Sequence, residues 1–108
     1  MLDHEADTLP YHSPLAQDPA LREVVSLFVE ELPCRAARMR AYFQDCQWHA
    51  LRMATRQLAT SASNHGFDQL LPFLTALDSR LSRRAPTAQV EEALETLLSE
   101  CGRVTATP

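Results

Sequence analysis

Residues 48–67 read WHALRMATRQLATSASNHGF and show the clearest helical pattern of the chain. Its apolar and small residues recur every three or four positions, which is the spacing of one face of an α-helix. Asp45 precedes the stretch as a candidate N-cap, and Gly66 follows it as a candidate left-handed C-cap. The sequence therefore predicts an amphipathic helix between them, with five residues facing inward: Trp48, Leu51, Thr55, Leu58 and Ala62.

The opposite side of this helix is polar and carries Arg52 and Arg56 one turn apart. His49, Thr60 and Ser63 lie on the same side by the same spacing. Polar residues on the outer face of a helix are often no more than a solvated surface. Two neighbouring guanidinium groups can nevertheless address one acidic patch together, because each offers several hydrogen-bond donors.

A long apolar stripe precedes this helix and begins behind Asp18-Pro19, which reads as an N-cap followed by Pro at the first helical position. The stripe continues past Pro33, and Pro inside a helix costs about 3 kcal/mol unless the chain bends there. The sequence predicts one long helix kinked at Pro33, or two abutting helices. The stripe consists of Leu21, Val24, Val25, Phe28, Leu32, Ala36, Met39 and Phe43.

Two more helices are predicted towards the C-terminus. One begins near Asp68 and tolerates Pro72 in its first turn. The other runs from about Pro86 to Cys101, with Gly102 behind it. Their inward positions are Phe67, Leu70, Leu74, Leu77 and Leu81 in the first, and Val90, Leu94, Leu97 and Cys101 in the second.

Short polar connections between amphipathic helices favour antiparallel neighbours. We therefore expect an all-α protein, an up-down antiparallel four-helix bundle over residues 18–104 with an N-terminal extension. Residues 1–17 contain Pro10, Pro14 and several acids without a helical period, and are expected to form a flexible arm. Residues 105–108 form a tail.

Composition excludes several classes of function. A formal net charge of -4 argues against a nucleic-acid partner, and no stretch approaches the roughly 18 apolar residues of a membrane span. With no basic-then-apolar leader, a cytoplasmic location is expected.

Three cysteines without Cys-x-x-Cys spacing indicate reduced packing thiols, with no disulfide or metal site. Asp45 and His49 have a spacing that could hold one edge of a metal site, but no further ligand accompanies them.

Charge is unevenly distributed along the chain. All ten basic residues are Arg. Residues 1–32 carry seven acidic residues against Arg22 alone, whereas residues 33–60 carry five Arg against Asp45 alone. An acidic first part and a basic middle indicate either internal pairing or a partner with an acidic face.

Residues 56–67 resemble the signature of histidine-containing phosphotransfer (HPt) domains of bacterial phosphorelays, which runs His-x-Leu-Lys-Gly-Ser-Ala and, after two or three small or polar residues, Gly and an apolar residue. Three positions depart from it: Arg56 stands at the phospho-accepting His, Ala59 at the Lys and Thr60 at the Gly. The resemblance covers about residues 18–103. Outside the motif, residues 28–33 resemble the first bundle helix of the family, Asp45–Trp48 the start of the next helix, and Leu77-Asp78 a Leu-Glu pair in the helix after it. The matching motif residues are Leu58, Ser61, Ala62, Gly66 and Phe67.

The three departures remove the phosphate chemistry that the resemblance would otherwise imply. Transfer requires a neutral imidazole nitrogen with a free lone pair, whereas a guanidinium stays protonated and only donates. The resemblance therefore implies a non-enzymatic pseudo-HPt domain without cofactors, which binds a response-regulator receiver domain or a histidine kinase. Its binding face would comprise His49, Arg52, Arg56, Ala59, Thr60 and Ser63.

Other functions stay open at the level of sequence. His49 lies two turns from Arg56, about 10 Å along the helix axis, and is the strongest alternative phospho-acceptor. His65 is expected to close the helix end, and His4 and His12 belong to the arm. Ser61 or Ser63 beside His65 lacks an oxyanion donor and an orienting acid. The chain could also be a purely structural bundle, as a monomer or a weak homodimer.

Overall fold

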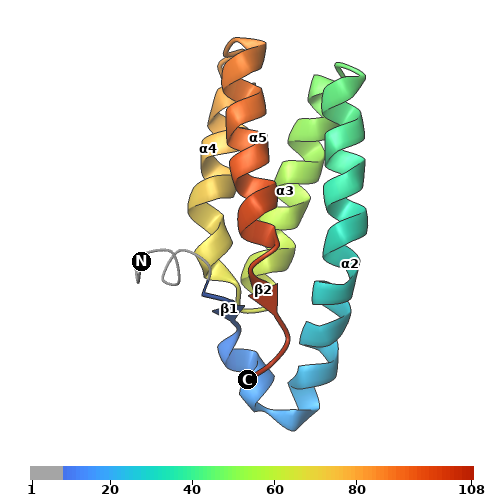
Figure 1. The fold of residues 1–108 in the computed structure, drawn as a ribbon, viewed down its shortest axis with the longest axis vertical. Coiled ribbons are helices and arrows are strands. Elements are labelled where there is room, and N and C mark those ends of the chain that lie inside the picture. The colour runs from blue at the N-terminus through green and yellow to red at the C-terminus, as the bar shows by residue number, and fades with distance from the viewer. Residues whose placement is uncertain (1–8) are drawn as a thin grey trace.

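A computed structural model describes residues 9–108 of the chain. These residues are mainly α-helical, as the sequence predicts (Figure 1). In chain order the elements are β1 (Tyr11–His12), the 3-10 helix η1 (Pro14–Gln17), α2 (Pro19–Gln44), α3 (Trp48–Asn64), the 3-10 helix η2 (Asp68–Leu70), α4 (Leu71–Ser82), α5 (Thr87–Cys101) and β2 (Val104–Thr105).

Helix α2 begins as predicted, because the Oδ1 atom of Asp18 accepts a hydrogen bond of 2.9 Å from the N–H of Ala20. It then runs as one element through Pro33. The alternative of two abutting helices is therefore wrong. Pro33 has no N–H to donate, so the carbonyl of Val29 loses its usual helical partner.

The predicted apolar stripe of α2 faces the core only in part. Val25, Phe28 and Leu32 are buried, but Leu21 and Val24 are 38% and 48% exposed. Phe28 stacks on the ring of His65, the residue that follows α3. Because α3 ends at this level, it does not cover the first turns of α2.

Helix α3 begins later than predicted. Asp45 is the C-cap of α2, and its N–H donates to the carbonyl of Ala41 at 3.0 Å. Gln47 precedes α3 and makes no side-chain cap. Trp48 was expected inside but is 37% exposed, with its ring edge against Phe43. The first turn of α3 lies at the end of the helical body, where little packs against it.

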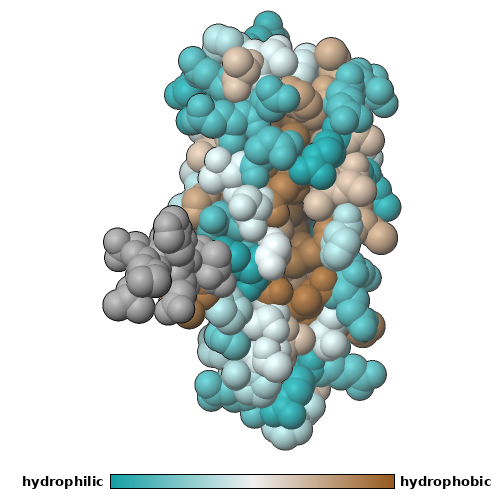
Figure 2. Space-filling view, in the orientation of Figure 1, coloured by the Kyte–Doolittle hydropathy of each residue, from teal (hydrophilic) through white to brown (hydrophobic). Residues whose placement is uncertain are grey.

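Most of the core is built from the remaining predicted positions, and Ala16, Ala93 and Val104 join it without having been predicted. On α3 the predicted positions are Leu51, Thr55, Leu58 and Ala62, and the hydroxyl of Thr55 donates to the carbonyl of Leu51 at 2.7 Å. Along the chain each α-helix packs against the next, and α2 also contacts α5. An apolar surface lies between α2 and α5 in Figure 2 and belongs to a shallow hollow lined by Leu32, Pro33 and Leu98, among others. The other buried apolar residues of η2, α4 and α5 are Leu70, Leu74, Leu77, Val90, Ala93, Leu94, Leu97 and Cys101.

The segment before α2 is attached to the end of α3. Ser13 is 1% exposed, and its hydroxyl donates to the carbonyl of His65 at 2.6 Å. Gly66 has a φ of +82°, which confirms the left-handed cap, and a Cβ atom there would collide with the Ser13 hydroxyl. The expected flexible arm over residues 1–17 therefore does not extend over Tyr11–Gln17, and residues 1–8 lie outside the described residues.

A second attachment joins both ends of the described chain. β1 and β2 pair in parallel, with Tyr11 opposite Val104 and His12 opposite Thr105. The tail predicted from residue 105 thus begins inside a strand. The hydroxyl of Tyr11 donates to the carboxylate of Glu100. The Arg103 guanidinium donates to the Tyr11 hydroxyl and to the Glu100 carboxylate, each at 2.9 Å, and lies over the Tyr11 ring. None of these pairings has a local sequence signature.

Candidate docking surface

Three side chains from two helices form the centre of the site. On α3 the Nε atoms of Arg52 and Arg56 each lie 3.2 Å from the Oδ1 atom of Asp78 on α4. The side chains of Arg52, Arg56 and Asp78 are 35%, 57% and 29% exposed. Two guanidinium groups thus share one carboxylate oxygen at the surface.

This arrangement orients the two arginines and keeps most of their donors free. A guanidinium has five N–H donors, and each arginine uses only its Nε–H for Asp78. Within residues 9–108 neither guanidinium makes another side-chain hydrogen bond or ion pair. With two positive charges and one negative charge, the cluster carries a local charge of +1 and can accept a further carboxylate or phosphate.

The other predicted site residues lie nearby on α3, but one is not at the surface. Thr60 and Ser63 are exposed, and the Thr60 hydroxyl donates back to the Arg56 carbonyl at 3.3 Å. Ala59 is half-buried and packs against the core. Its methyl group supplies no polar contact.

His49 and Arg52 open onto a second feature, a hollow of about 600 Å³ between the start of α3 and the α4–α5 connection. Arg80 and Arg84 also line it, and none of its lining residues is acidic. Arg80 is partly neutralised by Glu92 at 3.5 Å. The remaining lining residues are Trp48, Leu81, Ser82, Ala85, Thr87 and Val90. Positive charge therefore continues from Arg56 to this end of the molecule, although the chain as a whole has a net charge of -4.

The described histidines have different settings. His49 is exposed. The Nδ1 atom of His65 lies 2.7 Å from the carbonyl of Ser61, and its ring stacks on Phe28 at 4.7 Å. This ring is held as part of the helix end and makes no hydrogen bond to a serine hydroxyl of the described residues. The Nδ1 atom of His12 lies 2.8 Å from the carbonyl of Thr107. His4 lies outside the described residues.

The cysteines only partly match the expectation of packing thiols. Cys101 is buried, and desolvation, followed by the nearby charge of Glu100, raises its pKa to about 11. Cys34 and Cys46 are exposed and do not pack. In the described part of the chain, no three His, Cys, Asp or Glu side chains are grouped to hold a metal ion. No helix there is both long enough and apolar enough to pass through a bilayer.

Sequence reasoning identified Arg52 and Arg56 as a pair but missed Asp78, Arg80 and Arg84. Asp78 is the only acidic residue of α4, and this was a usable signal, because α4 follows α3 directly and had to pack beside it. The two additional arginines lie at the end of α4 and after it. Only the fold brings them next to His49.

Comparison of the chain with models of known protein families, with curated proteins and with solved structures gives no match.

Proposed function

We propose that this chain is a pseudo-HPt domain, a cytoplasmic adaptor of a two-component phosphorelay that binds a partner without accepting phosphate. In this proposal its helices form the up-down antiparallel bundle of that family. The partner is a response-regulator receiver domain or a histidine kinase, and the output is competition or scaffolding.

The observation that carries the proposal is the setting of Arg56. It occupies the motif position of the phospho-accepting histidine, is 57% exposed and is held by Asp78. A guanidinium at that position cannot take a phosphoryl group, because it has no free lone pair at neutral pH. It can bind the carboxylates that hold Mg²⁺ in a receiver, since arginine and carboxylate form strong charge-assisted hydrogen bonds.

The neighbouring residues support binding better than transfer. Ala59 and Thr60 replace the Lys and Gly of the motif, so a cation that would steady the phosphoryl oxygens and the clearance beside an imidazole are both missing. The hollow lined by Arg52, Arg80 and Arg84 extends the positive surface. An acidic partner surface would therefore be attracted over a wider area than the motif alone.

The test is a titration of the chain with purified receiver domains, in the phosphorylated and unphosphorylated forms, followed by calorimetry. We expect binding that weakens as salt rises, and no phosphate on this chain afterwards. Binding that is equally strong at high salt would contradict a docking surface built on arginines.

A second candidate keeps phosphotransfer and moves it to His49. One observation favours it: His49 is exposed and lines the arginine-rich hollow, where an anionic group could be held. Transfer of label from a phosphorylated receiver to the chain, abolished in His49→Ala, would establish this candidate in place of the first.

A further inference from the structure

One flank of α2 changes from acidic and apolar to basic along its length. Val24, Leu27, Glu31, Arg35 and Arg38 follow one another at spacings of three and four residues, so they lie along one side of the helix. This flank is separate from the Arg52–Arg56 surface, which α3 presents towards α4.

The N-terminal half of this flank exposes apolar side chains beside carboxylates. Val24 and Leu27 are 48% and 55% exposed, because they lie on a side of α2 that is turned away from the buried Val25 and Phe28. Glu23 and Glu30 are exposed next to Leu27, four residues before it and three after it, and neither makes an ion pair with another residue of the described chain. Exposed apolar residues next to one another on a helix are typical of a contact surface.

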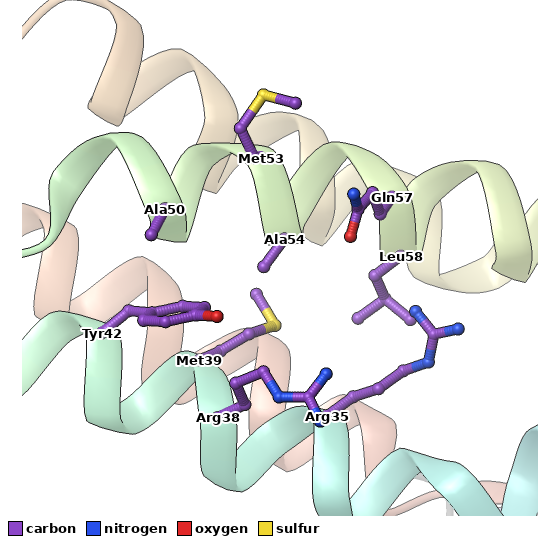
Figure 3. Close-up of a pocket in the computed structure, with 9 residues that line it drawn as sticks. All are labelled: Arg35, Arg38, Met39, Tyr42, Ala50, Met53, Ala54, Gln57 and Leu58. Atoms are coloured by element: carbon purple, nitrogen blue, oxygen red, sulfur yellow. The ribbon is translucent and has the colours of Figure 1, made fainter.

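The C-terminal half of the flank adjoins a hollow of about 250 Å³ between α2 and α3 (Figure 3). Met39 and Leu58 form its buried floor, while Ala50 and Ala54 face α2 with side chains too short to fill the space. Arg35 and Arg38 stand on the α2 side. Tyr42, Met53 and Gln57 complete the lining.

The charge of this hollow is not balanced from within the chain. None of its lining residues is acidic. Arg35 approaches a carboxylate of Glu31 only at 3.9 Å, and Arg38 makes no ion pair with any of residues 9–108. An occupant with carboxylates beside an apolar side chain would match both the floor and the rim. Leu27 with Glu23 and Glu30 is such a set, at the edge of this flank in the N-terminal half of α2.

We propose that two copies of this chain associate through this flank of α2, with the two helices antiparallel. In that arrangement Val24 and Leu27 of one copy insert into the hollow of the other, and Glu23 and Glu30 meet Arg35 and Arg38. A two-fold axis near the middle of α2 repeats the same contact in reverse, which is the isologous geometry of most homodimers. The proposal goes beyond the docking function, because it uses a different surface.

The volume of the hollow favours side chains of a second copy as its occupant, and the small contact area indicates a weak dimer. Small-molecule sites commonly have volumes of about 300–1,000 Å³, so this hollow suits one or two protein side chains better than a ligand. Contact along one helix lies at the low end of specific interfaces, below about 1,200 Å². The dimer should therefore form at high micromolar concentration and dissociate as salt rises.

The test is sedimentation equilibrium over a concentration series with the whole chain and two charge-reversed variants. Arg35→Glu/Arg38→Glu makes both halves of the flank acidic, and Glu23→Arg/Glu30→Arg makes both halves mainly basic. Each variant alone should dimerise at least tenfold more weakly than the wild type. An equimolar mixture should form a heterodimer, because each contact then pairs an acidic half with a basic half.

Arg83→Glu/Arg84→Glu is the matched control, since it makes the same change in net charge in the connection between α4 and α5. This variant should dimerise like the wild type. A wild-type chain that stays monomeric at every concentration would overturn the proposal, and so would a mixture of the two variants that stays monomeric. Circular dichroism of each variant shows whether the fold is retained.

Discussion

The Nε atom of Arg56 lies 3.2 Å from the Oδ1 atom of Asp78, and Arg52 reaches the same oxygen at the same distance. The Arg56 side chain, which the proposed function places at the position of a phospho-accepting histidine, is therefore held by the next helix. A partner carboxylate that binds these arginines must compete with Asp78 or use the N–H donors that Asp78 leaves free.

Replacing Asp78 with Asn tests this competition. The change raises the local charge of the cluster from +1 to +2, so we expect a severalfold tighter complex with a receiver domain, measured by calorimetry. The free energy of unfolding should fall by no more than about 1 kcal/mol, because exposed ion pairs contribute little. A weaker complex would mean that the Asp78 side chain itself contacts the partner.

Reversing both arginines tests the surface as a whole. Arg52→Glu/Arg56→Glu should weaken receiver binding more than tenfold, since charge-assisted contacts are worth about 1.5–3 kcal/mol each when partly desolvated. The melting temperature should fall only modestly, because the two new carboxylates would repel Asp78 but all three groups lie at the surface.

Arg35→Glu/Arg38→Glu is the charge-matched control for that experiment. It lies on the other side of α3 and should leave receiver binding intact. Equal losses from both pairs would indicate attraction by general charge and not docking at Arg56.

Gly66→Ala should strongly destabilise the fold. The φ of +82° disfavours any side chain by about 1 kcal/mol, and the new methyl group would also collide with the Ser13 hydroxyl. We expect a total loss of roughly 2–4 kcal/mol in chemical denaturation. Gly102→Ala is the comparison, because Gly102 has an ordinary helical φ of -66° and should cost clearly less. Equal costs would argue against the attachment of η1 to the end of α3.

Stability should decline in alkaline solution in two stages. The pKa of Cys101 is raised from 9.0 to about 11 by burial, so the folded state holds this proton more firmly than the unfolded state. The contribution of this proton to the free energy of unfolding is complete below pH 9. About 2 kcal/mol of it is lost as pH rises towards 11. The hydrogen bond to Glu100 raises the pKa of Tyr11 above 10.0, which adds a loss at higher pH. The chain has no Lys to titrate in this range.

Denaturation curves between pH 8 and pH 11 check the two stages. Cys101→Ala should flatten the decline that begins near pH 9, and Tyr11→Phe should reduce the part above pH 10. A profile identical in all three proteins would show that neither group is responsible.

Local chemistry made some features predictable from sequence. Asp18 before Pro19 and Gly66 after α3 have the structures expected of them, because caps depend on a few neighbouring residues. The inward positions of α3 from Leu51 onward were also correct, since helical periodicity reports the buried face.

Features that depend on where elements end in space were not predictable. Trp48 and Leu21 follow the apolar spacing but lie where no neighbouring helix covers them. The attachments of Ser13 to His65 and of Tyr11 to Glu100 join residues far apart in sequence. By contrast, the shared carboxylate of the two arginines could have been found, because Asp78 is the only acidic residue of α4.

The most direct measurement of the central claim is phosphoryl transfer from a radiolabelled receiver domain. The wild-type chain should gain no acid-labile phosphate. The Arg56→His variant should gain little, because Ala59 and Thr60 still lack phosphate support and clearance. Label on the wild-type chain that disappears in His49→Ala would rule out a pseudo-HPt domain and identify His49 as the phospho-acceptor.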